Sequence, residues 1–513
     1  MPNWDVTLRR TAGFLRTLFK SKMAIAGLII LIVYGFLAIA APIVTPYDPQ
    51  STVVAGGYSP PSWYRYVNEG ASLSQNVALE TRTGFFADPT QNGWQLKAYN
   101  PSLTGSYDTS TSFVQGAGSF KITLDPSSGP GNFTATFKKL FDWPYNGVPA
   151  RFLGSFAIDT PQATAQQAVQ VMIFIERTTH DYRRWNLTDN TVVFNATSGQ
   201  RNSSWGTYPL TTSGWHAARS LDSSSEALAA LVGSAGTGPA QIIFSSKDTY
   251  SYGVDITISR AAQSTGPISV HLDGMNLQLL GTSWGFLGTD NVGEDIWSQL
   301  IYGARISLIV GLLSAFIGIV LGLVVGLVAG YLGKVVDEVL MRFTDMLLVI
   351  PGLPLLIVLI SVLGDTLAAG RTLVLILVIG FLGWMGFARV VRAQVLSLKE
   401  RPFVEAAKAA GAGTGHITVR HIIPNIVGLI YVNLALAVPG AILTEAALSF
   451  LGLGDVSVLS WGRMLNLVET NAAQRIWWWV LPPGISIALV SLAFVMIGFS
   501  LDTLFNPRLR QRR

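Results

Sequence analysis

Few residues of this chain have the types and spacing that catalysis requires. The five histidines form no H-E-x-x-H pair and have no second metal-binding side chain beside them; they are His180, His216, His271, His416 and His421. The stretch VAGYLGKV lacks the first glycine and the final hydroxyl of a phosphate-binding loop. The chain has no cysteine, which excludes disulfides and metal–thiolate sites. We therefore expect no catalytic residue, no metal site and no cofactor in this chain.

The stretch FVEAAKAAGAG, residues 403–413, has the composition of a docking surface. Pro402 precedes it, and Gly411 and Gly413 end it because glycine tolerates a positive φ. The alanines between them predict a narrow helix with little side chain to keep a partner away; they are Ala406, Ala407, Ala409 and Ala410. Such a helix fits a cleft on a second protein, and the alternative is a short, solvated loop helix.

The elements that must position this helix are strongly apolar. Half of the 513 residues are apolar and 13% are charged, whereas a soluble domain carries about 25% charged residues. Uncharged runs long enough to cross a ~30 Å hydrocarbon core occur at residues 23–46, 306–332, 346–364, 372–388, 422–444 and 476–501. We therefore expect an all-α polytopic membrane protein with one transmembrane helix for each of these runs.

Basic residues in the loops predict the orientation. The first apolar run follows a basic lead made of Arg9, Arg10, Arg16, Lys20 and Lys22. This run is longer than the 7–15 residues that are typical of a signal peptide, so we expect a retained helix. The basic segments around Lys334, at 389–420 and at 508–513 fall on the same side as this lead. The positive-inside rule places that side, with both termini, in the cytoplasm.

Residues 47–283, between the first and second runs, have the character of an extracellular β domain. Short β-branched runs such as FKITL, FTATF, VQVMIFIE, AQIIFSS, VDITISR and ISVHL alternate with Gly, Pro and Asn clusters, which predicts a sandwich or jelly-roll. PQATAQQAVQ and SSSEALAALVG are predicted short helices. Residues 51–300 hold 14 basic and 18 acidic residues. The basic excess therefore belongs to cytoplasmic loops and anionic lipid, and nucleic acid is not an expected partner.

These observations divide the chain into predicted parts. A cytoplasmic segment, 1–22, precedes the first transmembrane helix at 23–46. The extracellular domain at 47–283 is followed by a five-helix core at 284–506, which contains a cytoplasmic loop at 396–424. A basic cytoplasmic tail, 507–513, ends the sequence.

Several other motifs have a structural alternative beside the functional one. The sequons at Asn132, Asn186, Asn195 and Asn202 are candidate glycosylation sites, although a region this rich in Ser and Thr also produces them by chance. Glycines at consecutive i+4 positions predict a strip for close helix packing; they are Gly318, Gly322, Gly326 and Gly330. Asn291 and Glu294 predict a capping box. Pro351 and Pro354 predict a bend that either lines a pathway or serves packing.

The stretch EAAKAAGAG…HIIPN resembles the EAA loop of ABC importer membrane subunits, E-A-A-x-x-x-G followed by x-x-P. Residues at the positions of that pattern are Glu405, Ala406, Ala407, Gly411 and Pro424. APIVTPYDP, LGTDNVGEDIWSQLIYGARISLIVG and EAALSFLGLG with SWGRML resemble the second permease of dipeptide/oligopeptide-type importers. The resemblance covers residues 1–50 and 284–513.

The resemblance implies a type I importer permease whose EAA loop is a coupling helix that docks into an ATPase subunit. The implied partners are a homologous second permease, two ATPase subunits that bind ATP and Mg, an extracellular solute-binding protein and membrane lipid. The implied solute is a dipeptide, an oligopeptide or an oligosaccharide. The chain departs from the family in its long insertion and in Glu294, where the family usually has Arg.

Two other classes of protein remain as alternatives. A membrane-anchored surface β-domain protein, either an adhesin or a surface enzyme, needs one or two spans and no coupling loop. A secondary transporter usually shows internal repeats and intramembrane carboxylates, neither of which the sequence indicates.

Overall fold

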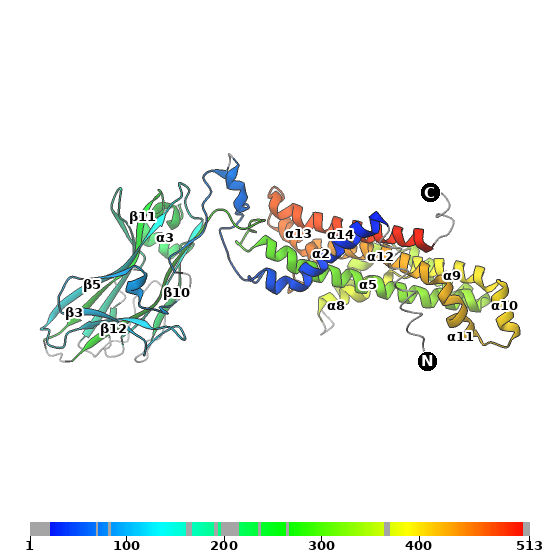
Figure 1. Ribbon diagram of the computed structural model, residues 1–513, viewed down its shortest axis with the longest axis horizontal. Helices are drawn as coiled ribbons and strands as arrows, with labels where there is room; N and C mark the ends of the chain where they lie inside the picture. The colour runs from blue at the N-terminus through cyan, green and yellow to red at the C-terminus, as the bar shows by residue number, and fades with distance from the viewer. Residues whose placement is uncertain are drawn as a thin grey trace. The chain divides into compact units, whose positions relative to one another are not determined.

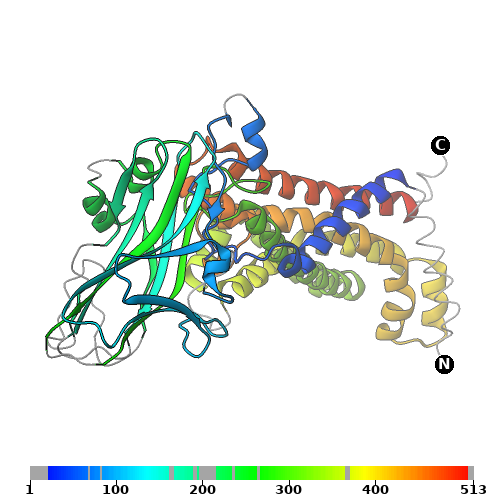
Figure 2. The same cartoon turned by 60° about the vertical axis from the view of Figure 1, so that its left-hand side comes forward.

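The computed structural model of the chain describes residues 21–67, 70–80, 84–160, 167–188, 193–195, 215–233, 237–262, 266–363 and 370–505. The chain divides into two units. Residues 1–52 and 296–513 form the helical unit, and residues 53–295 form the β unit. Figures 1 and 2 show the long helices of the first and the strands of the second.

The helical unit contains the membrane-spanning part of the chain. Its long helices are α2 (Lys22–Val44), α5 (Ile296–Leu332), α8 (Arg371–Leu382) continued by α9 (Met385–Lys399), α12 (Ile423–Phe450) and α14 (Trp477–Phe505). Among the described residues, 5 helices are long and apolar enough to cross a membrane, or 6 if one bent helix pair counts as a span. The shorter α10 (Pro402–Ala409) and α11 (Thr414–Ile417) lie at the opposite end of this unit from α13 (Trp461–Thr470) (Figures 1 and 2).

The predicted third span is a broken one. The helices α6 (Lys334–Val349) and α7 (Gly352–Leu363) are bent by 88° relative to each other. Pro351 stands at the break, where it has no N–H to continue the hydrogen bonding of α6. Pro354 lies in the first turn of α7, where helical N–H groups have no partner within the helix. The proline pair therefore separates two helices that meet at nearly a right angle.

The start of α5 differs from the prediction. The helix begins at Ile296, ten residues before the predicted span, so the capping box expected at Asn291 and Glu294 is wrong. The carboxylate of Asp290 instead accepts the backbone N–H groups of Val292, Gly293 and Glu294, each at 2.9 Å.

The β unit is a sandwich of two antiparallel sheets. One sheet has the order β10 (His216–Asp222), β6 (Arg151–Asp159), β12 (Ile268–Leu280), β4 (Ser119–Leu124), β3 (Leu103–Asp108), with β1 (Val77–Ala78) on β12. The other has the order β2 (Trp94–Ala98), β5 (Gly131–Trp143), β11 (Asp248–Arg260), β7 (Gln167–Arg177), β8 (Arg183–Asn186), with β9 (Val193–Asn195) on β7. The predicted fold class, helical membrane spans with an inserted β domain, is confirmed.

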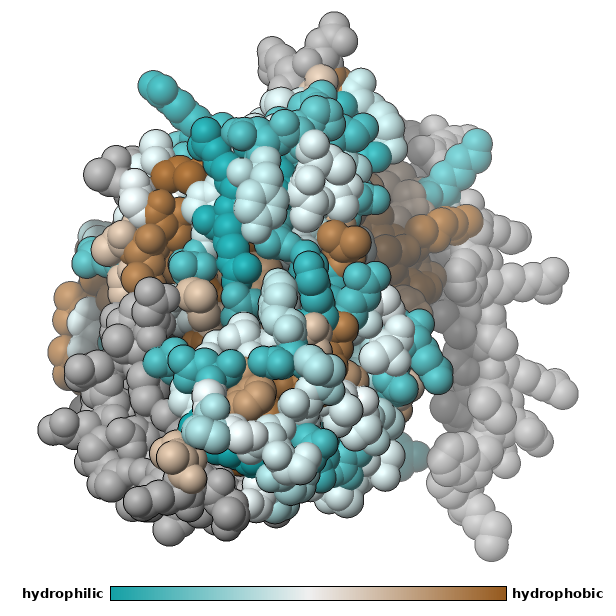
Figure 3. All heavy atoms as spheres, turned by 90° about the vertical axis from the view of Figure 1, so that its left-hand side faces the viewer, coloured by the Kyte–Doolittle hydropathy of each residue, from teal (hydrophilic) through white to brown (hydrophobic). Residues whose placement is uncertain are grey.

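Aromatic and β-branched side chains from both sheets fill the core of the sandwich. The largest fully buried ones include Trp94, Phe137, Trp143, Phe152, Tyr250 and Tyr252. Phe120 of one sheet stacks on Phe137 of the other, with ring centroids 4.3 Å apart. Two helices, α3 (Glu226–Val232) and α4 (Pro239–Ile243), pack on this core through Leu228 and Ile243. Polar residues cover most of the described surface in Figure 3, as expected for outward-facing strand positions.

The two ends of the β unit lie side by side. Val53 pairs with Glu294 in an antiparallel bridge. The N–H of Val54 donates to the carbonyl of Gly293 at 2.8 Å, and that of Tyr58 donates to the carbonyl of Asp290 at 2.6 Å. The β unit therefore extends to residue 295, whereas the sequence predicted that the domain ends at residue 283.

Candidate functional site

The alanine-rich stretch forms α10 and a glycine turn, supported by α9 on one side and α12 on the other. Pro402 occupies the first turn of the helix, where a missing N–H costs nothing. Gly411 follows the helix with φ +80°, a conformation that glycine adopts without strain. Its N–H donates to the carbonyl of Lys408 at 2.9 Å, and that of Ala412 donates to the carbonyl of Ala407 at 3.0 Å. These bonds satisfy carbonyls that a helix end leaves open.

One residue anchors α10 to the rest of the helical unit. Val404 is fully buried in a cluster with Val395 of α9, Ile417 of α11, Ile422 at the end of η4 (Thr418–Ile422) and Ile426 at the start of α12. The N-terminal part of α12 is preceded by this π-helical turn, η4. A short helix of this kind is held by tertiary packing and not by its own hydrogen bonds.

The other face of α10 is open. Of the five residues that match the EAA pattern, Glu405, Ala406, Gly411 and Pro424 are exposed, and Ala407 is half-buried against the anchoring cluster. A Cβ atom on Gly411 would meet no atom within 4 Å. The loop therefore presents a narrow surface of small side chains on a buried anchor.

The glycine strip of α5 lies against α8 and α9. Gly318, Gly322, Gly326 and Gly330 are all buried. A Cβ atom on Gly322 would lie 2.7 Å from the carbonyl oxygen of Trp384, and one on Gly326 would lie 2.6 Å from that of Ala388. These separations are shorter than any Cβ contact tolerates, so the helices approach to a distance that only glycine permits.

A polar group in the membrane-spanning part was missed by the sequence reasoning. Glu445 of α12 is 1% exposed, and its carboxyl group accepts hydrogen bonds from the hydroxyls of Ser449, at 2.7 Å, and Ser307, at 3.3 Å. The predicted span ended at residue 444, whereas α12 continues to Phe450. An ionisable residue buried within a transmembrane helix is a signal of function.

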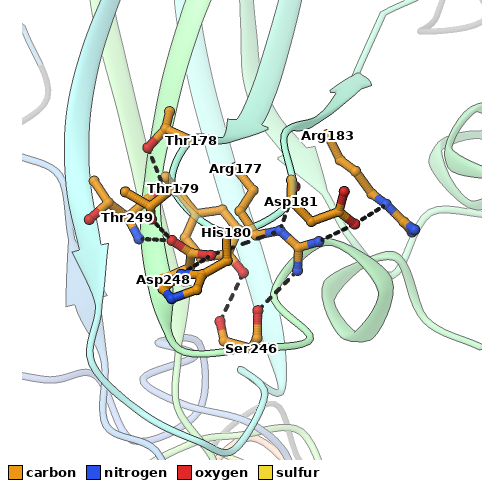
Figure 4. A network of polar contacts seen from close by, with 10 residues as sticks. Arg177, Thr178, Thr179, His180, Asp181, Arg183, Ser246, Asp248 and Thr249 are labelled. Atoms are coloured by element: carbon orange, nitrogen blue, oxygen red, sulfur yellow. Dashed lines mark hydrogen bonds and ion pairs between the residues drawn. The ribbon is translucent and has the colours of Figure 1, made fainter.

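The β unit carries a polar network at the turn after β7 (Figure 4). The buried carboxylate of Asp248 accepts bonds from the N–H of Thr249 at 2.7 Å and the hydroxyl of Thr179, and lies 3.2 Å from Nδ1 of His180. The guanidinium of Arg177 donates to Ser246 at 3.0 Å. Among the described residues, no three His, Asp or Glu side chains are grouped to hold a metal. These contacts join the end of β7 to the start of β11 and stabilise the turn after β7.

A second network lies on the outer face of the sheet formed by β5, β7 and β11. The carboxylate of Glu176 accepts bonds from Lys138, from the hydroxyl of Ser251 at 2.9 Å and from that of Tyr182 at 3.0 Å. Burial opposes ionisation of Glu176, but the three donors outweigh this effect and lower its pKa below the ordinary value. Arg184 lies over the ring of Phe174 and pairs with Asp255. The charges of this face thus compensate one another.

The candidate glycosylation residues have different surroundings, as do three tryptophans of the β domain, whose side chains could either stack on sugars or pack in the core. Trp185 packs against the sandwich core and Trp215 lies 6.0 Å from Phe113, whereas Trp205 is outside the described residues. Asn132 and Asn186 are exposed on strands β5 and β8, and Asn195 ends β9. Asn202, like the cytoplasmic segment and tail, is outside the described residues.

The chain is similar to known proteins of membrane transport. Residues 318–511 match the profile of the family described as "Binding-protein-dependent transport system inner membrane component". Residues 10–61 match "N-terminal TM domain of oligopeptide transport permease C". The chain is 38% identical to the dipeptide transport system permease protein DppC of Bacillus subtilis (strain 168) over 241 residues, which are 47% of this chain and 73% of that one.

Two further comparisons cover similar shares of the chain. The oligopeptide transport system permease protein OppC of Escherichia coli (strain K12) is 39% identical over 224 residues, 44% of this chain and 72% of that one. Among solved structures, an inward-facing form of the MetNI methionine ABC transporter covers 41% of this chain and 95% of its own, with 19% identity and a TM-score of 0.33.

Proposed function

Because the chain belongs to the family of dipeptide- and oligopeptide-type ABC importer permeases, we propose that it forms half of a pathway that moves peptides into the cell. The 38% and 39% identity to a dipeptide and an oligopeptide permease supports this substrate class over the oligosaccharide alternative. Family membership and the several membrane spans also argue against the anchored adhesin or surface enzyme.

The remaining parts of the machine are partners of this chain. The subunit pairs with a homologous permease across the pathway, with two ATPase subunits in the cytoplasm and with a solute-binding protein outside. ATP and Mg are held by the ATPase subunits, since the chain has no phosphate-binding loop. The subunit itself catalyses no reaction. Its contribution is to convert closure of the ATPase pair into movement of the helices around the pathway.

The observation that carries this proposal is the geometry of α10. Val404 ties the helix to α9, α11 and α12, whereas Glu405 and Ala406 face outward. A motion imposed on the exposed face is therefore passed directly to the long helices. The exposed alanines Ala406, Ala409 and Ala410 allow an ATPase cleft to approach the helix backbone at their positions, because their side chains are small.

Replacing Ala406 tests the docking of α10. Ala406 is exposed, so Ala406→Trp adds bulk on the open face without a clash inside the chain. We expect this variant to reach the membrane in normal amounts but to lose co-purifying ATPase subunits and peptide uptake by about tenfold or more, as expected for a disrupted interface centre. Gly411→Trp also adds bulk, but it would add backbone strain at φ +80°.

The matched control is Ala406→Ser, which changes the same position but keeps its side chain small. It should retain ATPase binding and uptake close to those of the wild type. If Ala406→Trp binds ATPase subunits and imports peptide as well as Ala406→Ser does, α10 is not the coupling helix.

We place the β unit outside the cell. The two membrane helices that flank the insertion, α2 and α5, are consecutive spans, and the basic segments predict cytoplasmic termini. The β unit is accordingly exposed to the medium, where it helps to capture solute or to position the solute-binding protein.

A further inference from the structure

Glu445 lies in the last two turns of α12, at the end that precedes α13 in the chain. In Figure 1, α13 lies at the opposite end of the helical unit from α10. The span that contains it, Thr414–Phe450, is apolar enough to cross a membrane. Its side chain is nevertheless 1% exposed. A carboxyl group in such a place is costly unless hydrogen bonds compensate for the lost water. The partners of this carboxyl group therefore indicate what it holds in place.

The carboxyl group of Glu445 lies at the end of a directed chain of hydrogen bonds. The backbone N–H of Trp461 donates to Oγ of Ser307 at 3.2 Å, and that hydroxyl donates to Glu445 at 3.3 Å. Trp461 is the first residue of α13, so its N–H is one of those that a helix start leaves without a partner. Ser449, one turn farther along α12, donates to the other carboxylate oxygen at 2.7 Å. One side chain thus joins α5, α12 and the start of α13.

The side chains around this junction fit closely. The indole N–H of Trp461 donates to the carbonyl of Leu300 in α5 at 3.0 Å. A Cβ atom on Gly303 would lie 3.1 Å from the Trp461 side chain. A Cβ atom on Gly462 would lie 2.7 Å from the Cα atom of Ala446. The backbone of α13 therefore lies close to α5 at Gly303 and to α12 at Ala446.

We propose that Glu445 is a positioning residue that holds α5, α12 and α13 together as one rigid body throughout the transport cycle. This inference rests on the proposed transport function. Separating α5 from α12 would break the bond between Ser307 and Glu445 and leave the carboxyl group with Ser449 as its remaining donor, in a region that contains little water, which is unfavourable. The rearrangements that open and close the pathway then occur at other helix contacts.

The absence of cysteine from the chain makes a disulfide test of this proposal simple. Gly311 lies one turn from Ser307, and Ile442 lies one turn from Glu445. A Cβ atom on Gly311 would lie 3.6 Å from Cβ of Ile442, within the range of disulfides. Ile442→Cys also removes the branches that would crowd the new side chain. The Gly311→Cys/Ile442→Cys pair therefore locks α5 to α12 under oxidising conditions and releases them with a reductant.

The experiment measures ATP-driven uptake of a labelled dipeptide by proteoliposomes that contain the complete importer. With Glu445 present, the oxidised disulfide should leave the uptake rate within about twofold of the reduced protein, because a rigid pair has no motion to lose. Glu445→Ala should lower uptake about tenfold or more, as expected for loss of charge-assisted hydrogen bonds. The oxidised disulfide should restore uptake in Glu445→Ala, and reduction should abolish the restoration.

Each contrary result overturns the proposal. It fails if the disulfide stops uptake in the presence of Glu445, if Glu445→Ala transports normally, or if oxidation does not restore transport to Glu445→Ala. Should Glu445→Ala not accumulate in the membrane, Ser307→Ala breaks one link of the same chain and is judged by the same restoration. Failure of the wild-type complex to import peptide would instead refute the proposed function, and ATPase co-purification shows separately that each variant assembles.

Discussion

Gly326 allows a direct test of the close packing between α5 and α9. A Cβ atom on this residue would lie 2.6 Å from the carbonyl oxygen of Ala388 and 2.6 Å from Cβ of Val391. The first of these atoms belongs to the backbone, so a rotamer change cannot relieve the contact. Gly326→Ala must therefore push α9 away from α5.

The size of the effect follows from two opposing contributions. Replacing a glycine inside a helix by alanine stabilises that helix by about 0.5–1 kcal/mol. Overpacking a close contact costs about 1–3 kcal/mol. Gly440 of α12 provides the matched control, because a Cβ atom there would meet nothing within 4 Å. We therefore expect Gly326→Ala to be less stable than Gly440→Ala by about 1–3 kcal/mol.

The assay is reversible unfolding of the purified chain in mixed micelles with increasing SDS, followed by tryptophan fluorescence. Gly326→Ala should unfold at a lower SDS fraction than the wild type, and Gly440→Ala at an equal or higher one. Gly326→Leu should be more severely affected than Gly326→Ala. Equal unfolding of Gly326→Ala and Gly440→Ala would show that α5 and α9 do not pack as closely as described.

Two predictions concern the β unit. Because the pKa of Glu176 is lowered in the folded state, its contribution to stability is complete above its ordinary pKa and is lost as the pH falls through the lowered value. Glu176→Gln should destabilise the β unit at neutral pH by about 2 kcal/mol and flatten the acid side of its pH–stability curve in thermal unfolding; an unchanged curve would contradict the role of this network. For sidedness, a single cysteine at Tyr182, which is 64% exposed, should react with an impermeant maleimide in intact cells, whereas one at Val335, which is 71% exposed and follows Lys334, should react only after permeabilisation. The reverse pattern would refute the orientation.

The sequence predicted the helical unit well where a single property decides the outcome. Length and hydropathy locate membrane helices because the bilayer imposes both. The bend between α6 and α7 was visible as Pro351, since proline removes a hydrogen bond whatever surrounds it. The start of α5 at Ile296 was not predicted, because polar and charged residues such as Gln299 and Arg305 lie inside its first turns. Burial among neighbouring elements, which hydropathy does not report, accommodates Gln299.

The β unit shows where local patterns lose to context. FKITL, FTATF, VDITISR and ISVHL lie in strands as predicted, because alternating side chains match the two faces of a sheet. AQIIFSS was predicted as a strand, but Pro239 starts a short helix there and Ile243 packs into the core from it. The end of PQATAQQAVQ, predicted helical, belongs to β7, where pairing with β11 overrides the helix preference of alanine and glutamine.

Glu445 is the first residue of the stretch EAALSFLGLG, yet the sequence did not indicate that its side chain is buried in a hydrogen-bonded junction. The predicted span, 422–444, stopped one residue before this carboxylate, since a charged residue normally marks where an apolar run ends. What keeps it inside is Ser307, 138 residues away in the chain, together with the first N–H of α13. No periodicity or local spacing connects these three groups. Only the packing of α5 against α12 and α13 brings them together, so the role of the carboxylate is a property of the fold and must be tested there.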